Sequence, residues 1–355
     1  MDDLINCIDR IPEKLKEIHT NRDTTFGGLM DYLSSRQSPE ELVFIASGSS
    51  YNGAFAVEQF AREQCGLKVS LVYPNIFVNY THNLNNRALY IFISQTGFTK
   101  LVHEGIEKVQ AGGCMNCAIA ADSETPIAKK ADVFIDMGCG HEEFMYRTVG
   151  YSATVATLYL MSIKIALQMG NISQSKAEEF YADFTKLPEG IAQTAAATEG
   201  WYKKNKFSLL RRNKMLLTAT NDYWPVVQEA DIKIMEMVPI MTRSFELEEF
   251  IHGPQNAFND EMLFFILSKA GEDEQKVTAI ANFLKSEIGF CSVVGACARD
   301  DKDLKLVPMS KYFSPLEMVT AFQLLAYHMA TDKGRDLKRG VNTSITNYIT
   351  KTISK

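Results

Sequence analysis

The sequence predicts an α/β protein of two similar halves, each a parallel sheet sandwiched by helices. Short apolar runs alternate with helix-like segments along most of the chain, which is typical of parallel sheets covered on both faces. Each half ends in a long apolar helix. The length of 355 residues is enough for two domains with separate cores.

The first half begins with a helical segment that reaches about residue 38, in which Ile11, Leu15 and Ile18 recur at helical spacing. Strands and helices then alternate. The expected strands are 42–46, 69–72, 89–93, 117–121 and 133–137, and the expected helices are 54–65, 101–109 and a long closing helix at about 144–169.

The second half repeats this scheme. Its expected strands are 215–219, 262–267, 291–294 and 306–307, and its expected helices are 223–237, 274–286 and 315–331. The predicted organisation is a helical arm at 1–38, a first domain at 39–170, a connecting helical segment at 171–200, a second domain at 201–335 and a tail at 336–355.

Composition limits the possible partners. Hydrophobic residues make up 46% of the chain, charged residues make up 23%, and the net charge is -6. This balance is typical of a folded globular protein. Because there is no basic excess, we expect neither nucleic acid nor an anionic membrane surface as a partner. A phosphorylated ligand would be held by local donors in a pocket.

The N-terminal residues have neither the basic start nor the apolar core of a signal peptide. The most membrane-like stretch, 149–170, is interrupted by Lys164 and reads as a buried helix. Seven cysteines without an export signal fit reduced thiols and a cytoplasmic location. Cys114 and Cys117 form a C-x-x-C, which we interpret as a buried loop-to-strand transition. We expect no metal and no cofactor.

Two hydroxyl-rich loops are the first candidate site. Ser47-Gly48-Ser49-Ser50 follows the first strand, and Ser94-Gln95-Thr96-Gly97-Phe98-Thr99 follows the third. In an open parallel sheet, ligands bind beyond the carboxyl ends of the strands. Each loop precedes a helix, whose free N–H groups favour an anion. The alternative is that these residues are helix caps and turns; two such loops in one sheet favour a phosphate site.

Glu236 and His252 are the second candidate site. A carboxylate and an imidazole are the side chains most often used for proton transfer. Alone, Glu236 would read as a solvated helix residue and His252 as a packed or capping histidine before the Gly253-Pro254 turn. Lys233 lies on nearly the same helix face as Glu236, so it either contacts substrate or pairs with that carboxylate.

These motifs together resemble a known family. Ser94-Gln95-Thr96-Gly97-Phe98-Thr99 resembles the S-Q-S-G-x-T phosphosugar loop of the sugar isomerase (SIS) domain. The segment 229–236, Glu-Ala-Asp-Ile-Lys-Ile-Met-Glu, is similar to the E-G-A-L-K-L-K-E helix of glucosamine-6-phosphate synthase, and its register continues to His252-Gly253-Pro254. The resemblance covers about residues 40–335 and implies two SIS-type domains.

The sequence also departs from the synthase pattern. It has no N-terminal cysteine nucleophile and no room for a glutaminase domain, so we do not expect ammonia transfer. Met235 stands where the synthase helix has a lysine. Tyr146-Arg147-Thr148-Val149 stands where the synthase reads A-S-T-K. Lys351 is only a loose candidate for the lysine of the synthase tail.

The resemblance is greatest to the deglycase branch of the family, which implies an enzyme that cleaves fructoselysine 6-phosphate or glucoselysine 6-phosphate. The implied base is Glu236 and the implied proton-transfer partner is His252. The expected phosphate or sugar contacts are Ser49, Ser50, Ser94, Gln95, Thr96, Thr99 and Thr148, with Lys233, Arg147, Glu229 and Lys351 as further candidate contacts.

Two other functions stay open: an aldose-ketose isomerase or deaminase that acts on an amino-hexose phosphate or a ketohexose phosphate, and a sugar-phosphate sensor without catalysis. The resemblance also implies a homodimer in which each active site takes Glu236 and the loops from one chain and His252 from the other. Arg147 could meet the carboxylate of an amino-acid moiety, or it could form a surface ion pair.

Overall fold

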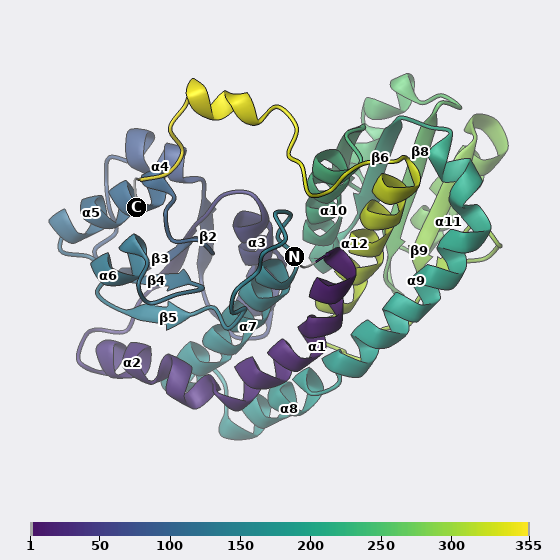
Figure 1. Cartoon of the computed structure of the whole chain (residues 1–355). Helices are drawn as coiled ribbons and strands as arrows, with labels where there is room; N and C mark the ends of the chain where they lie inside the picture. The colour runs from purple at the N-terminus through teal and green to yellow at the C-terminus, as the bar shows by residue number, and fades with distance from the viewer. Residues whose placement is uncertain (1–2, 354–355) are drawn as a thin grey trace. The chain divides into compact units, whose positions relative to one another are not determined.

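The computed structural model describes residues 3–353 and confirms the α/β prediction. The chain divides into two compact units, each with its own five-stranded sheet (Figure 1). The first unit contains Glu13–Thr185 and the tail from Gly340, and the second contains Asp3–Pro12 and Lys186–Arg339. The division falls inside the segment predicted to connect the domains.

The sheet of the first unit has the strand order β2-β1-β3-β4-β5, and every pairing is parallel. Its strand order reverses between β1 and β3, and such a reversal is where ligands bind in open α/β sheets, beyond the carboxyl ends of the strands. The strands are β1 (Glu41–Ile45), β2 (Val69–Val72), β3 (Ala88–Ile93), β4 (Met115–Ala120) and β5 (Phe134–Asp136).

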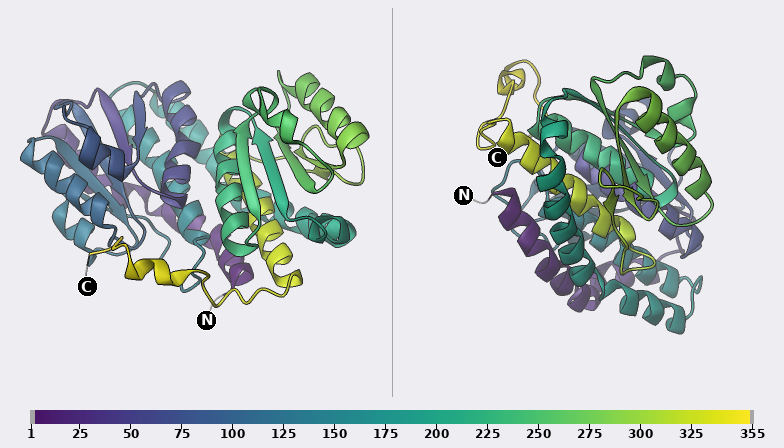
Figure 2. Two further views of the ribbon diagram at one scale, coloured as in Figure 1. Left: turned by 90° about the horizontal axis from the view of Figure 1, so that it is seen from above. Right: turned by 90° about the vertical axis from the view of Figure 1, so that its right-hand side faces the viewer.

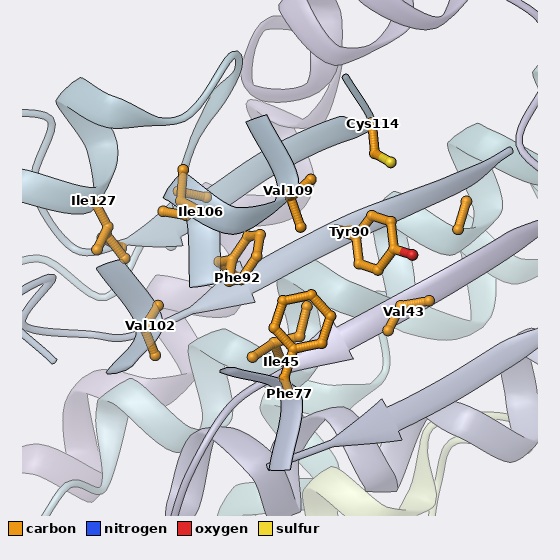
Figure 3. Packing of buried hydrophobic residues seen from close by; sticks show 13 residues of the cluster. Val43, Ile45, Phe77, Tyr90, Phe92, Val102, Ile106, Val109, Cys114 and Ile127 are labelled. Atoms are coloured by element: carbon orange, nitrogen blue, oxygen red, sulfur yellow. The ribbon is translucent and has the colours of Figure 1, made fainter. Parts of the chain in front are cut away.

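Helices cover both faces of this sheet. On one face, Phe77, Tyr90 and Phe92 belong to a buried cluster (Figure 3) to which α4 (Pro74–Tyr80), α5 (Lys100–Ala111) and α6 (Pro126–Lys130) contribute. Phe44 and Ile91 point to the opposite face, because side chains alternate along a strand, and both are fully buried. The helices α2 (Arg22–Ser34), α3 (Ser49–Glu63) and α7 (Val149–Gln168) form that layer.

The sheet of the second unit has the order β10-β9-β8-β6-β7, again with every pairing parallel. Read from the other edge, β6 takes the place of β1 and β8 the place of β3. The predicted internal repeat is therefore present in the topology. The strands are β6 (Lys214–Ala219), β7 (Met241–Glu246), β8 (Met262–Ser268), β9 (Phe290–Gly295) and β10 (Leu304–Lys305).

The remaining long helices are α1 (Leu4–Thr20), α8 (Gln174–Phe184), α9 (Leu187–Leu210), α10 (Trp224–Met237), α11 (Glu274–Phe283) and α12 (Ser314–Asp332). Several predicted boundaries are wrong. The long helix expected at 144–169 begins only at Val149, the helix expected at 54–65 already begins at Ser49, and the short strand expected at 306–307 lies at Leu304–Lys305. The elements α4, α6 and β7 were not predicted.

Among residues 3–353, α7 is the one helix long and apolar enough to cross a membrane, and 94% of its most apolar 18-residue stretch is buried within the protein. It is a core helix, as its interruption by Lys164 indicated. Cys114 and Cys117 are buried free thiols at the start of β4, which confirms the loop-to-strand interpretation. The described residues contain no group of three or more His, Cys, Asp or Glu side chains that could hold a metal ion.

Candidate functional site

The two hydroxyl-rich loops lie at the carboxyl ends of β1 and β3, which pair directly. The first loop ends at Gly48, whose φ of +58° favours glycine, and α3 begins at Ser49. The second loop ends at Thr99, directly before α5. Two helix N-termini therefore meet at one edge of the sheet, where the N–H groups of a first helical turn can bind an anion. The first N–H of α5, that of Lys100, is already used by the Lys351 carbonyl. Ser49 and Ser50 are half-buried in the first turn of α3.

Hydrogen bonds close the loop after β3. Ser94 Oγ and Thr99 Oγ1 lie 2.8 Å apart, and the Gly97 backbone N–H donates to the Ser94 carbonyl across 2.9 Å. Gly97 has a φ of +68°, and a Cβ there would lie 2.3 Å from the Thr125 Cβ. The loop is fixed before any ligand arrives, with two hydroxyls at its base. Thr96 is exposed at its tip.

Gln95 does not point to solvent. Its Nε2 donates to Glu142 Oε2 across 2.9 Å. The Glu142 carboxylate also accepts the backbone N–H groups of Thr148 (2.7 Å), Val149 (3.0 Å) and Gly150 (3.1 Å). This buried carboxylate therefore occupies the N-terminus of α7, which is why the helix begins only at Val149. The helix N-termini left for a phosphate at this edge are those of α3 and α5.

Two other predicted contacts belong to the same segment. Thr148 is fully buried, and its hydroxyl donates to the Tyr146 carbonyl across 2.9 Å. Arg147 Nη1 donates to the carbonyls of Glu142 (2.8 Å) and Phe144 (3.3 Å). The Thr148 hydroxyl thus stabilises the turn that precedes α7, and Arg147 is held by backbone carbonyls.

The C-terminal tail pairs with the phosphate loop. The Lys100 N–H donates to the Lys351 carbonyl, and the Ile353 N–H donates to the Phe98 carbonyl, each across 3.0 Å. An isolated antiparallel bridge joins Thr99 to Thr352. The yellow end of the chain accordingly lies against the first unit in Figures 1 and 2. The structure places Lys351 beside the loop that the sequence predicted for phosphate.

In the second unit, α10 carries three charged side chains one turn apart. Lys233 Nζ lies 3.6 Å from Glu229 Oε1 and 3.2 Å from Glu236 Oε2. The Lys233 and Glu229 side chains are 2% and 0% exposed, whereas Glu236 is 43% exposed. A buried ammonium requires a paired carboxylate, and Glu229 supplies it. Lys233 therefore pairs with Glu236, one of the two alternatives, and holds a carboxylate that is open to solvent.

His252 lies on the surface of the second unit. Its side chain is 62% exposed, and its Nε2 is 3.1 Å from Glu248 Oε1. Glu248 also pairs with Lys276. The hydrogen bond from Lys276, and after it the one from His252, holds the pKa of Glu248 below its usual value. Gly253, with a φ of +118°, turns the chain directly after the histidine.

The first unit matches a known domain family. Residues 37–167 match the family model described as the SIS domain. The matched range contains β1, β3, both hydroxyl-rich loops and almost all of α7. The first unit therefore carries a SIS domain, and this prediction from the sequence is confirmed.

The chain is homologous to isomerising glutamine–fructose-6-phosphate aminotransferases. It is 23% identical to the one from Fusobacterium nucleatum over 313 residues, which cover 85% of this chain and 51% of that protein. It is 23% identical to the one from Lactococcus lactis over 352 residues, which cover 96% of this chain and 57% of that protein. The chain thus spans about half the length of the curated relatives it matches.

Solved structures share the fold. A candidate phosphosugar isomerase from Clostridium difficile 630 has a TM-score of 0.91 at 23% identity, with 98% of both chains covered. The C-terminal domain of a glucosamine-fructose-6-phosphate aminotransferase from Francisella tularensis has a TM-score of 0.84 at 16% identity, over 94% of this chain and 96% of that one. A glucosamine-6-phosphate deaminase from Thermotoga maritima has a TM-score of 0.72 at 20% identity, over 93% and 97%.

Proposed function

We propose that this chain is a deglycase that cleaves a 6-phosphorylated sugar–amino acid adduct, fructoselysine 6-phosphate or glucoselysine 6-phosphate, to a hexose 6-phosphate and the free amino acid. The observation that carries the proposal is the arrangement on α10. A solvent-accessible carboxylate, Glu236, is oriented by a buried ammonium, Lys233, at 3.2 Å. A general base needs a fixed position and access to the substrate.

The phosphate of this substrate would bind at the edge of the first sheet. The Ser94 and Thr99 hydroxyls and the N-termini of α3 and α5 lie there and offer the donors that a phosphate needs. The proposal requires these loops and Glu236 to act on one substrate molecule.

The proposed chemistry needs only proton transfers and water. Glu236 would remove a proton at one of the carbons C1 and C2 and return it at the other, through an enol-amine. His252 would exchange a proton with the substrate oxygen or nitrogen as the tautomer shifts. Water then adds to the resulting imine, and the carbon–nitrogen bond breaks to give the amine and the sugar carbonyl. Each positioned acid or base typically contributes about 10²–10⁴-fold in rate.

We further propose that the second unit is a second SIS-type domain, that the chain is a cytoplasmic homodimer and that it uses no metal or cofactor. The strand order shared by the two units supports the first of these. The structural likeness to a glucosamine-6-phosphate deaminase favours an amino-hexose phosphate isomerase or deaminase as the second candidate function.

A mass-spectrometric screen tests the proposal. Purified protein is incubated with fructoselysine 6-phosphate, glucoselysine 6-phosphate and glucosamine 6-phosphate, and the release of lysine or ammonia is followed. We expect lysine from one of the first two. Glu236→Gln should lower kcat by at least about 10²-fold, whereas Glu272→Gln, an exposed acid in the same unit, should not change it.

Other outcomes of the same screen decide against the deglycase. Ammonia from glucosamine 6-phosphate, with no lysine from either adduct, would support the deaminase. Tight binding of the phosphosugars without turnover would support the sensor. Full activity of the Glu236→Gln protein would remove Glu236 from the mechanism.

A further inference from the structure

A pocket of about 440 Å³ opens beside the phosphate loop of the first unit. Its wall includes Gln95, Thr96 and Phe98 of the loop, Asp122 after β4, and Glu142 and Arg147 before α7. The volume lies within the range of small-molecule sites, about 300–1,000 Å³. The phosphate loop is therefore also one wall of a second compartment.

The charges in this pocket are of both signs. Glu142 already accepts four hydrogen bonds, so the permanent charges open to a ligand are those of Arg147 and Asp122. The imidazole of His141 also lines the pocket. The two hydrogen bonds that hold Arg147 both use Nη1, and a guanidinium has five N–H donors. Asp122 is exposed, and its Oδ1 accepts the Glu124 N–H across 2.8 Å.

This charge pattern suits a zwitterion better than a phosphate. A phosphate beside the Asp122 carboxylate would be repelled, whereas the hydroxyl-lined base of the loop, formed by Ser94 and Thr99, carries no acid. A free α-amino acid group has one carboxylate and one ammonium close together, which match Arg147 and Asp122 in sign. An arginine can also bind a carboxylate in a bidentate manner, through two parallel hydrogen bonds.

We propose that this pocket binds the amino-acid end of the adduct, with Arg147 on its α-carboxylate and Asp122 on its α-ammonium. The inference rests on the proposed deglycase function and names the part of the substrate that the pocket selects. The phosphate and the amino acid would then bind on either side of one loop, with the sugar joining them.

Adducts that lack one charge each test the assignment. The probes are fructoselysine 6-phosphate and the matching 6-phosphofructosyl adducts of cadaverine, which lacks the carboxylate, and of 6-aminohexanoate, which lacks the α-ammonium. We expect the wild-type kcat/KM to fall about 10- to 100-fold for each truncated probe, as is typical when one charge-assisted hydrogen bond is lost. Arg147→Met should abolish the discrimination against the cadaverine adduct only. Asp122→Asn should abolish the discrimination against the 6-aminohexanoate adduct only.

Glu124→Gln is the matched control, because Glu124 is an exposed acid two residues from Asp122 and pairs with Lys129 across 2.8 Å. It should leave all three values unchanged. Binding of fructose 6-phosphate, measured by calorimetry, verifies that each variant is folded. If Arg147→Met does not fold, Asp122→Asn alone decides the question. Equal use of all three adducts by the wild-type protein, or discrimination against the 6-aminohexanoate adduct that survives in Asp122→Asn, would overturn the proposal.

Calorimetry with the Glu236→Gln protein separates this inference from the proposed function. Charge-dependent binding of the adducts, together with no turnover by the wild-type protein, would reject the deglycase and keep the pocket assignment. Turnover without any dependence on Asp122 or Arg147 would keep the deglycase and reject the pocket assignment.

Discussion

The Gln95 side chain donates to Glu142 Oε2 across 2.9 Å and joins the phosphate loop to the start of α7. Gly150 makes room for this contact, because a Cβ there would lie 1.9 Å from Gln95 Oε1. The position of the loop and the position of the helix therefore depend on each other. A substitution of Gln95 or Glu142 should therefore change both ligand binding and stability.

Glu142→Gln should destabilise the first unit by at least about 2 kcal/mol, because hydrogen bonds to a charged acceptor are worth about 1.5–3 kcal/mol each. The variant places an amide NH₂ among N–H groups that need acceptors. Urea unfolding measures the effect. Glu143→Gln, at the exposed neighbouring position, serves as the control and should change little. Equal stability of Glu142→Gln and wild type would show that Glu142 does not hold the N-terminus of α7.

Gly97→Ala should cost more stability than Gly113→Ala. The two glycines have nearly the same positive φ, +68° and +66°, so the backbone cost of an alanine is similar at both. The added Cβ at Gly97 would clash with Thr125, whereas nothing lies within 4 Å at Gly113. We expect a difference of at least about 1 kcal/mol in thermal or urea unfolding, and weaker phosphate binding only for Gly97→Ala. An equal loss of stability in both variants would mean that Thr125 moves away from the added Cβ without measurable cost.

Thr99→Ala should weaken the binding of a hexose 6-phosphate about 10- to 100-fold, because it removes a hydroxyl from a charged acceptor. Ser94→Ala should act similarly, since the two hydroxyls bond to each other at 2.8 Å. Thr99→Ser keeps the hydroxyl and should bind as the wild type does. Calorimetry with the phosphorylated and the free sugar measures the effect. A protein that binds both sugars equally well would contradict the phosphate site.

The apolar runs predicted most of the fold because buried parallel strands are continuous hydrophobic segments. The predicted strand 69–72 coincides with β2, and the predicted strand 89–93 lies one residue inside β3. In contrast, β7 is an edge strand that pairs only with β6. Its polar sequence contains no continuous hydrophobic segment that would predict a strand. Side-chain contacts that arise only on folding hold it, since the Ser244 N–H donates to Asp231 Oδ2 across 2.8 Å.

The motifs of the candidate site were visible in the sequence, but the partners of its side chains were not. Glu142 lies six residues before Thr148, the residue that directly precedes α7, which is not the spacing of a usual N-cap. No local pattern therefore predicted that it would occupy the helix end. The burial of Lys233 depends on how α10 packs in the second unit, and spacing along the helix left pairing and substrate contact equally open.

The pH dependence of stability should report on Glu248. Its pKa is lowered in the folded state, mainly by Lys276 and then by His252. A lowered folded-state pKa adds stability above the unfolded-state pKa, and that stability is lost as the pH falls through the folded-state value. Glu248→Gln should therefore have a slightly lower Tm than the wild type at about pH 7, and the difference should shrink as the pH falls below the unfolded-state pKa of a glutamate, about 4.3. A difference that does not depend on pH would contradict this pairing.

The two proposed proton-transfer residues, Glu236 and His252, have different partners within one chain. Within one chain, Glu236 bonds to Lys233 and His252 bonds to Glu248. His252 is also 62% exposed, so its imidazole is accessible to another subunit. The family resemblance implies that it serves the active site of the partner in a homodimer, and two-fold pairing is the commonest form of homo-oligomer.

If each site takes Glu236 from one chain and His252 from the other, two inactive variants should complement each other. Glu236→Gln and His252→Ala homodimers each lack one group in both sites. A mixed dimer has one site that lacks both groups and one site that is intact, so it should regain about half of the wild-type activity per dimer. Native mass spectrometry measures the extent of subunit exchange, and the assay described above measures lysine release. Heterodimers that form without recovered activity would contradict the shared site, because each chain would then supply both groups to its own site. A fully active monomer would contradict the homodimer itself.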